Sequence, residues 1–203
     1  MTTRAEQKQK TRRTILDAAL TLLSDNRSLD SLGLREVTRE AGLAAPSFYR
    51  HFPNMEELGL AIVEEAGLFL RQMLRKTRQR IGETESAINT SVDTFIEFLE
   101  QYPVHFRILL QEQVGYSAEY RKAVRSEVDN FVTELVNYLD ARSDALNRPK
   151  LDAKNTAEAM IAVVIAMGTK LTVLDRKEKQ RIRDNAAEQL RIIMRGAISV
   201  RKI

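Results

Sequence analysis

The sequence predicts an all-α fold, and three observations support that prediction. Prolines and glycines are few, with four and eight respectively among 203 residues. Apolar residues recur at spacings of three and four, which is the period of an amphipathic helix. We also find no run of alternating apolar and polar residues, the pattern of a half-buried strand. The chain is long enough for one sizeable core or for two small units.

Composition narrows the class of protein further. Apolar residues make up 43% and charged residues 30% of the chain, which excludes global disorder. The absence of cysteine excludes disulfides, a thiol nucleophile and thiolate metal sites. A net charge of +4 mildly favours a polyanionic partner. The longest uncharged run, residues 159–169, is too short to cross a bilayer, and the charged start lacks the apolar stretch of a secretory signal. We therefore expect a mature N-terminus, a cytoplasmic location and no membrane partner.

The first helices follow from apolar spacing and from their end signals. We expect the first over about Glu6–Leu23, behind a basic leading segment. The second is expected over Leu34–Ala41, with Gly33 as a second-rank N-cap and Gly42 as the left-handed residue that ends it. A third, short helix should begin near Ala45. The next residue, Pro46, would then lie in the first turn, where the missing N–H breaks no hydrogen bond within the helix.

The remaining chain is expected to be helical as well. Asn54 and Glu57 form a capping-box-like start for a long helix that reaches about Ile81 and ends at Gly82. Further helices are expected near residues 84–101, 103–111, 117–141, 152–173 and 178–198.

The segment from Leu34 to Phe52 carries the most informative pattern. Phe48 and Phe52 are four residues apart, so on a helix they share a face and can anchor it in a small core. The other side chains of this helix must then face outward, and they are Ala45, Pro46, Ser47, Tyr49, Arg50 and His51. Small residues allow close approach to a groove, Ser and Arg can hydrogen-bond base edges, and Tyr and His can bind phosphate oxygens. Two short helices joined by a glycine-containing turn form a helix-turn-helix.

A plainer interpretation is that these are two surface helices of a bundle with a solvated polar face. Two features weigh against it. Tyr49 is an aromatic residue without an obvious reason to face water. In addition, a basic arm precedes the first helix and contains Arg4, Lys8, Lys10, Arg12 and Arg13. Such an arm either follows a phosphate backbone or is a frayed, solubilising terminus.

Enzyme signatures are missing from the sequence. It has no glycine-rich phosphate or dinucleotide loop, no G-x-S-x-G elbow and no H-E-x-x-H motif. Its histidines are His51 and His105. We therefore expect no enzyme, no catalytic residue, no metal and no cofactor.

On these residues the chain resembles the TetR family of transcriptional repressors. The segments TRRTILDAAL and LREVTREAGLAAPSFYRHFPNMEEL look like the first four helices of that family, over about residues 8–65. More narrowly, MTTRAEQKQKTRR, SLGLREV, SFYRHF, ELGL and HFRILLQEQVG resemble the FabR/DesT-type regulators, which repress unsaturated fatty-acid synthesis or acyl desaturation. The resemblance implies a three-helix DNA-binding domain over 1–53, with its helix-turn-helix at about 34–52, and a helical ligand-binding and dimerisation domain over 54–203.

Carried over residue by residue, the resemblance implies roles within the helix pair. Arg35 would lie near a phosphate, and Tyr49 and His51 would hold the DNA backbone. The residues that would enter the groove are Ala45, Pro46, Ser47 and Arg50. Two departures remove a phosphate contact each, since Gly33 stands in place of the usual Ser or Thr and Met55 in place of the usual Lys. The basic arm would compensate through Lys10 and Arg12.

For the rest of the chain the resemblance implies an effector cavity and a dimer interface. Apolar residues on helix faces are the candidate lining, although core packing is the plainer interpretation of each: Phe69, Met73, Phe95, Phe98, Phe106, Leu109, Met160, Val164, Ile165 and Met167. For the narrower group the effector would be a long-chain acyl-CoA. The last two helices would join a homodimer that reads a palindromic operator in double-stranded DNA. The apolar run AMIAVVIAMG indicates a helix that is buried on several sides. A dimer interface would bury it in this way, and so would the interior of a monomer.

Three alternatives to a fatty-acid repressor stay open. A TetR-type regulator of a drug or other apolar metabolite shares every N-terminal feature. A helical enzyme would need a catalytic pair that the sequence does not display. A membrane-surface protein would use the basic arm and the basic residues between 71 and 80.

Overall fold

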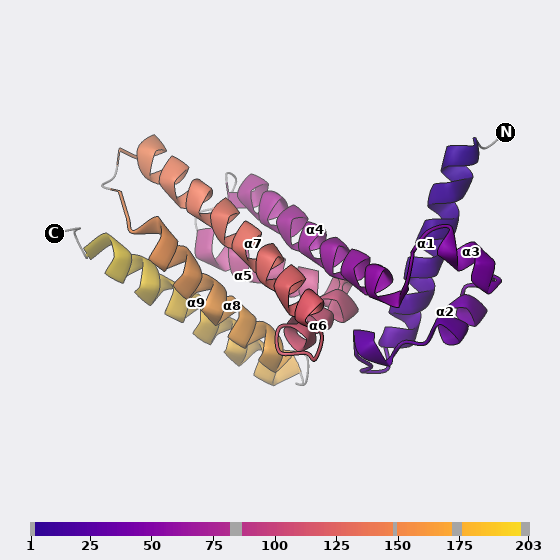
Figure 1. Cartoon of the computed structure of the whole chain (residues 1–203). Coiled ribbons are helices and arrows are strands. Elements are labelled where there is room, and N and C mark those ends of the chain that lie inside the picture. The colour runs from indigo at the N-terminus through magenta and orange to yellow at the C-terminus, as the bar shows by residue number, and fades with distance from the viewer. Residues whose placement is uncertain (1–2, 82–86, 148–149, 172–175, 200–203) are drawn as a thin grey trace. The chain divides into compact units, whose positions relative to one another are not determined.

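Every regular element in the described part of the chain is a helix (Figure 1), which confirms the predicted all-α class. The computed structural model describes residues 3–81, 87–147, 150–171 and 176–199. The α-helices are α1 (Arg4–Leu23), α2 (Leu34–Glu40), α3 (Ala45–Tyr49), α4 (Met55–Ile81), α5 (Ala87–Gln101), α6 (Pro103–Glu112), α7 (Ala118–Ala145), α8 (Ala153–Leu171) and α9 (Arg176–Ser199), and η1 (Leu29–Ser31) is a 3-10 turn. None of the described helices is long and apolar enough to cross a membrane.

The described residues form two compact units. Unit 1 comprises residues from 1–66 and 104–126, and unit 2 those from 67–103 and 127–203. Helices α4 and α7 each begin in unit 1 and continue into unit 2. The observed helices agree closely with the predicted ranges, whereas the predicted stop at Gly82 lies outside the described residues.

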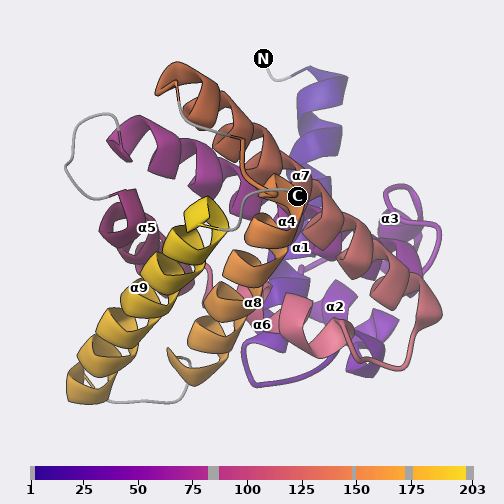
Figure 2. The ribbon, with the colours of Figure 1, turned by 90° about the vertical axis from the view of Figure 1, so that its left-hand side faces the viewer.

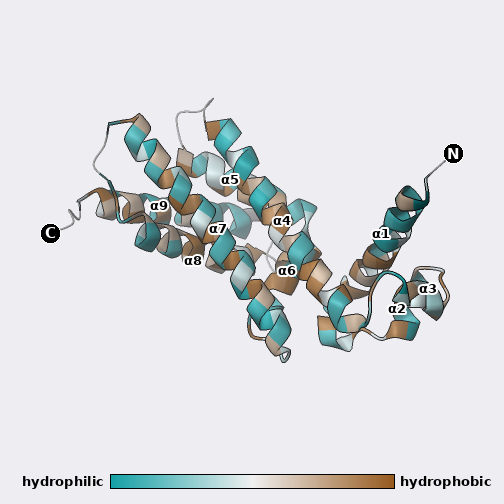
Figure 3. Ribbon diagram, turned by 45° about the horizontal axis from the view of Figure 1, so that its top comes forward, coloured by the Kyte–Doolittle hydropathy of each residue, from teal (hydrophilic) through white to brown (hydrophobic). Residues whose placement is uncertain are grey.

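The start of α1 differs from the prediction of a basic leading arm. Thr3 accepts a hydrogen bond from the Glu6 amide at 3.2 Å, and the Glu6 carboxylate accepts one from the Thr3 amide at 2.7 Å. This reciprocal capping box starts the helix at Arg4, so the basic residues belong to the helix itself. Figure 3 shows the hydrophilic first turns of α1 and the more apolar half that follows. Arg13 is engaged as well, in ion pairs with Asp17 and Glu65.

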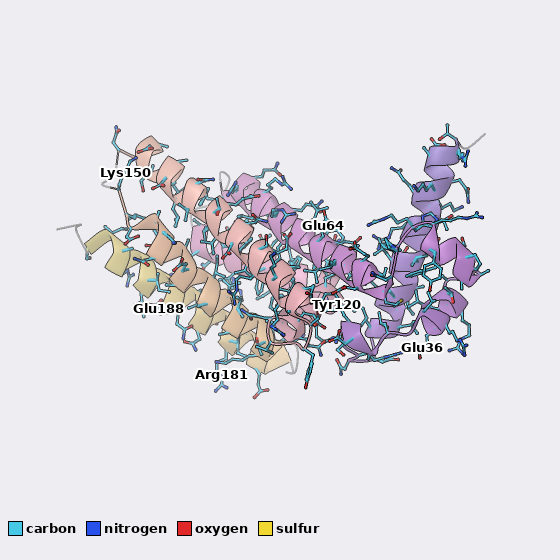
Figure 4. All side chains as sticks on the ribbon, viewed as in Figure 1. Glu36, Glu64, Tyr120, Lys150, Arg181 and Glu188 are labelled. Carbon is cyan, nitrogen blue, oxygen red and sulfur yellow. The ribbon has the colours of Figure 1, made fainter. Side chains whose placement is uncertain are left out.

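Unit 1 has an apolar core to which α1, α2, α3, α4, α6 and α7 contribute. Its most deeply buried side chains are Ile15, Leu23, Val37, Phe48, Leu58, Ile62, Val63, Ile108 and Val124. Polar contacts join α6 to the first elements, since Arg107 donates to the backbone oxygens of Leu23 and Arg27. Tyr120 packs directly against Gly59, where any side chain would overlap its hydroxyl, and this allows α7 to approach α4 closely (Figure 4 labels Tyr120).

Unit 2 is built on the packing of α8 along α9, with α5 against both (Figure 2). Its core includes Leu74, Val92, Phe95, Phe98, Phe131, Leu139, Ala157, Ile161 and Leu190. Arg183 on α9 binds both carboxylate oxygens of Asp93 on α5, at 2.6 and 2.8 Å. This two-pronged contact fixes the rotation of α9 against α5.

Candidate functional site

The α2–α3 pair has the turn that the sequence predicts. Helix α2 ends at Glu40, and Gly42 then has a φ of +65°, a left-handed conformation that glycine adopts at little cost. The Leu43 amide donates to the Thr38 oxygen at 2.9 Å, which closes the turn. Helix α3 begins at Ala45, as predicted, with Pro46 in its first turn.

The N-terminus of α2 is capped although Gly33 lacks a hydroxyl. The Gly33 amide donates to the Glu36 carboxylate at 3.2 Å, and Arg27 donates to the same carboxylate at 2.9 Å. These two contacts, that of Arg27 first, lower the pKa of Glu36 (labelled in Figure 4). The expected N-cap position is therefore confirmed, with its polar contact supplied by Glu36 instead of a Ser or Thr.

Phe48 and Phe52 anchor the second helix as predicted. Their side chains are 0% and 2% exposed, and their ring centroids lie 5.8 Å apart. Tyr49, between them in sequence, is 56% exposed and stands edge-on to Phe48. The Arg12 guanidinium lies 4.8 Å from the Phe52 ring centroid, so a cation of α1 covers the anchor. Burial of the two anchors turns the polar side chains of α3 outward.

A basic groove of about 550 Å³ lies between the start of α1 and the end of α3. One wall carries the predicted residues Ser47, Arg50 and His51. The other wall consists of Thr3, Arg4, Gln7, Lys8 and Thr11, of which Arg4 and Lys8 belong to the basic segment noted in the sequence and the other three were not predicted. The spacing of these α1 residues at three and four marks one helix face, which is the signal that could have identified them. No acidic side chain is among the described residues that line the groove, so its charge favours an anion.

His51, which lines this groove, has a ring nitrogen without a hydrogen-bond partner among the described residues. This nitrogen, Nδ1, is buried. Burial lowers the pKa of His51, and the neighbouring charges of Lys8, Arg12 and Arg50 lower it further. A phosphate in the groove would provide a negative charge that compensates a protonated ring.

The other predicted DNA contacts lie outside the groove lining. Arg35 on α2 and Ala45, Pro46 and Tyr49 on α3 are exposed. On α1, Lys10 and Arg12 are also exposed, with Arg12 over Phe52.

Unit 2 contains an apolar cavity of about 150 Å³ among five helices. It is lined from α4 by Leu74, Thr77 and Ile81, from α5 by Ala87, Ile88 and Ser91, from α7 by Phe131, Leu135, Tyr138, Leu139 and Arg142, from α8 by Met160, Ile161 and Val164, and from α9 by Leu190 and Met194. Met160 and Val164 are thus the predicted lining residues that the structure places here.

Other predicted lining residues occupy different places. Phe69, Met73 and Phe98 line a second cavity of about 130 Å³ between α4 and α5, where Phe69 stacks on Tyr102 with centroids 4.2 Å apart. The remaining candidates are absent from the lining of both cavities. Phe95 and Met167 are buried and Ile165 is half-buried in unit 2, whereas Phe106 and Leu109 are buried in unit 1. Burial of Phe95, Met167, Phe106 and Leu109 agrees with core packing, the plainer interpretation of each.

Two family models match the sequence over most of its length. The model for bacterial regulatory proteins of the tetR family matches residues 15–67. The model for a tetracyclin repressor-like C-terminal domain matches residues 84–196.

Solved structures resemble the whole chain at low identity. A TetR-family transcriptional regulator from Mesorhizobium loti MAFF303099 has a TM-score of 0.74 at 13% identity, over 96% of this chain and 98% of that one. A TetR-family regulator from Syntrophomonas wolfei has a TM-score of 0.72 at 14% identity, over 96% and 98%. The transcriptional regulator FadR from Bacillus subtilis, in complex with stearoyl-CoA, has a TM-score of 0.69 at 15% identity, over 91% and 98%. At these identities the likeness is one of fold.

Proposed function

The chain belongs to the TetR family of bacterial regulatory proteins, and we propose that it is a ligand-responsive repressor that binds a palindromic operator through α2 and α3. Members of this family regulate transcription and are not enzymes. They bind DNA operators, dimerise and bind small-molecule effectors. Within this proposal, residues 1–53 are the DNA-binding domain and residues 54–203 the ligand-binding and dimerisation domain.

The basic groove between α1 and α3 carries the proposal. Ser47, Arg50 and His51 face Arg4 and Lys8 across it. We assign Ala45, Pro46, Ser47 and Arg50 to base edges in the major groove, because short side chains admit the backbone and Ser and Arg can hydrogen-bond bases. Phosphate contacts are assigned to Arg35, Tyr49, His51, Lys10 and Arg12, and the groove adds Arg4 and Lys8.

Exposed apolar surface on the last two helices supports dimerisation there. On α8, Ala162 and Ala166 are exposed and four residues apart, so they share a face. On α9, Ile192 is 60% exposed, and Gly196, four residues on, has open space at its Cα. In a dimer formed through these faces, each subunit would contribute one recognition helix to a palindrome whose half-sites are about 34–36 Å apart.

A long-chain acyl-CoA is the effector that we propose, as in regulators of unsaturated fatty-acid synthesis of the FabR/DesT type. FadR of Bacillus subtilis, which shares the fold, was solved with stearoyl-CoA. The cavity in unit 2 has a mainly apolar wall that suits a hydrocarbon chain. Its volume of 150 Å³ is below the roughly 300–1,000 Å³ of ligand pockets, so the lining side chains must move apart when a ligand binds. Met160 and Met194 are flexible lining residues that can yield.

Helix α4 would transmit the effect of the ligand. It begins shortly after α3 and runs unbroken to Ile81, and Leu74, Thr77 and Ile81 line the cavity. A ligand that binds one position of α4 more tightly than another shifts the population of DNA-competent dimers by that difference in affinity.

Selection of bound duplexes from a random pool, with and without palmitoyl-CoA, tests the proposal. We expect a palindromic consensus whose recovery changes when palmitoyl-CoA is present. In binding assays on the selected duplex, Ser47→Ala and Arg50→Ala should relax preference at one position per half-site. Tyr49→Ala and His51→Ala should weaken binding to all sequences, with a salt slope lower by about one for each lost phosphate contact. Unchanged affinity in all four variants would overturn the assignment of the interface.

The response to effectors is measured separately. If binding to the consensus duplex changes with an unrelated apolar drug and not with palmitoyl-CoA, the assignment as a repressor stands and acyl-CoA is not its effector. Thermal-shift screening against both classes of compound identifies which class stabilises the protein.

A further inference from the structure

Among the described polar groups in the wall of the unit 2 cavity, the Tyr138 hydroxyl is a hydrogen-bond donor without an acceptor. Thr77 and Ser91 also line the cavity, but their hydroxyls donate to the Met73 and Ala87 oxygens at 2.9 and 2.8 Å. The Tyr138 hydroxyl is buried and has no hydrogen-bond partner among the described residues. Because it lies in the wall of an apolar cavity, water is a poor substitute partner there.

A second orphan donor lies next to Tyr138. The Arg78 guanidinium lies over the Tyr138 ring, 5.4 Å from its centroid, and its buried Nε has no partner among the described residues. The other nitrogens of Arg78 reach Glu134, through the backbone oxygen and the carboxylate. Two neighbouring buried donors without acceptors are unusual, and they favour a ligand that brings acceptor oxygens.

The charge of the cavity wall selects against cations. Arg142 is one turn beyond Tyr138 on α7, so the two share a face, and it is exposed. No acidic side chain is among the described residues that line the cavity. A cationic apolar ligand would therefore meet Arg142 and orphan donors without a compensating carboxylate.

From these observations we infer that the cavity binds an acyl compound whose carbonyl oxygen accepts a hydrogen bond from Tyr138. The anionic part of the ligand lies towards Arg142 and solvent, and the hydrocarbon chain lies among α4, α5, α8 and α9. The shared chemistry is that of an acyl carbonyl oxygen, which a free carboxylate and a thioester both present. This inference rests on the proposed function, in which the cavity is the effector site, and it names the residues that recognise the head of the effector.

Calorimetric titration of the full chain with three twelve-carbon probes tests the inference. The probes are dodecanoyl-CoA, dodecanoate and dodecylammonium, each below its micellar concentration. We expect both acyl probes to bind, and dodecylammonium to bind at least about tenfold more weakly. A CoA thioester that binds more tightly than dodecanoate identifies the thioester as the preferred source of the carbonyl.

Variants assign the binding to the named side chains. Tyr138→Phe keeps the ring over which Arg78 lies. It should weaken binding of dodecanoyl-CoA by about 3- to 10-fold, the effect of one neutral hydrogen bond, and binding of the dodecanoate anion by at least as much, because hydrogen bonds to charged groups are stronger. Arg142→Gln should weaken them by about two- to fivefold, as for an exposed ion pair. Tyr116→Phe and Arg125→Gln are matched controls at exposed positions outside the cavity and should bind as the parent does. Thermal unfolding of each variant confirms that it is folded.

The outcomes separate this inference from the proposed function. Unchanged acyl affinity in Tyr138→Phe and Arg142→Gln, with operator binding still responsive to dodecanoyl-CoA, would overturn the inference and leave the acyl-responsive repressor intact. Preference of the parent for dodecylammonium, or failure to bind any of the three probes, would overturn the inference together with the acyl effector. Operator binding without ligand tests the repressor in either case.

Discussion

The unpartnered ring of His51 predicts that DNA binding takes up a proton. In the free protein burial lowers the pKa of this imidazole, and Lys8, Arg12 and Arg50 lower it further. A phosphate in the groove would raise that pKa, because a negative charge favours the protonated ring. The bound state therefore holds a proton at pH values where the free state does not. Operator affinity should fall as the pH rises from the free pKa through the bound pKa.

The size of this effect follows from the charges involved. A phosphate about 4 Å from the ring contributes about 1 kcal/mol in water and about 4 kcal/mol at an effective dielectric constant near 20. At about 1.4 kcal/mol per pKa unit, the bound pKa lies roughly 0.7–3 units above the free one. One proton per subunit changes the affinity by at most about tenfold per pH unit for each bound subunit.

Fluorescence anisotropy on the selected duplex, from pH 5.5 to 8.5 at constant ionic strength, measures the slope. His51→Gln should lose affinity at the acid end and remove most of the slope. The other histidine of the chain provides the matched control, since His105 lies outside the groove and contacts Glu65 at 3.0 Å. His105→Gln should retain the slope of the parent. An equal slope in the parent and in His51→Gln would refute the placement of a phosphate at this ring.

Three further predictions concern stability and are measured by urea unfolding. Gly59→Ala should cost about 1–3 kcal/mol, because the added methyl overlaps the Tyr120 hydroxyl; a gain in stability, as alanine gives at an unobstructed helix position, would contradict the packing argument. Burial raises the pKa of Glu112, so its ionisation disfavours the fold, and stability should fall as the pH rises from about 4.3 to the raised value; Glu112→Gln should lose that decline, and a decline as large as the parent's would argue against it. Phe52→Ala removes a ring that is 2% exposed. It should lower the free energy of unfolding by about 3–5 kcal/mol and abolish operator binding; a loss of stability below 1 kcal/mol would show that the ring is not an anchor.

The helix pair could be predicted in detail because local rules determine its positions. Gly42 ends α2 because a glycine, which has no Cβ, adopts a positive φ at little cost, and the spacing of Phe48 and Phe52 determines which face of α3 is buried. Asn54 accepts from the Glu57 amide at 2.8 Å, as its sequence pattern predicts. The start of α1 could have been predicted by the same local rules, because Thr3 and Glu6 have the spacing of a capping box. The run of basic residues favoured the interpretation as an arm instead.

The second wall of the groove and the lining of the cavity depend on contacts between distant segments. Lys8 faces His51 only because α1 packs beside α3, a relation that no local spacing encodes. Phe98 and Phe106 have the same apolar pattern on adjacent helices, yet the first lines a cavity in unit 2 and the second is core of unit 1. Periodicity identifies the buried face of a helix but not whether another side chain or a void lies opposite it.

Among the described residues, each of the two sites includes a residue with a buried polar atom that has no hydrogen-bond partner. The atoms are Nδ1 of His51, a residue that lines the basic groove, and Oη of Tyr138, a residue of the cavity wall. Each such atom costs about 1–3 kcal/mol in the folded protein, and that cost is recovered when a ligand supplies the missing partner. Because folded proteins tolerate few of these atoms, their position beside a basic groove and in an apolar cavity is an argument for two different ligands, an anion and an acyl carbonyl. Each ligand binds the folded state alone, so each should raise the unfolding temperature in proportion to the logarithm of its concentration above its Kd.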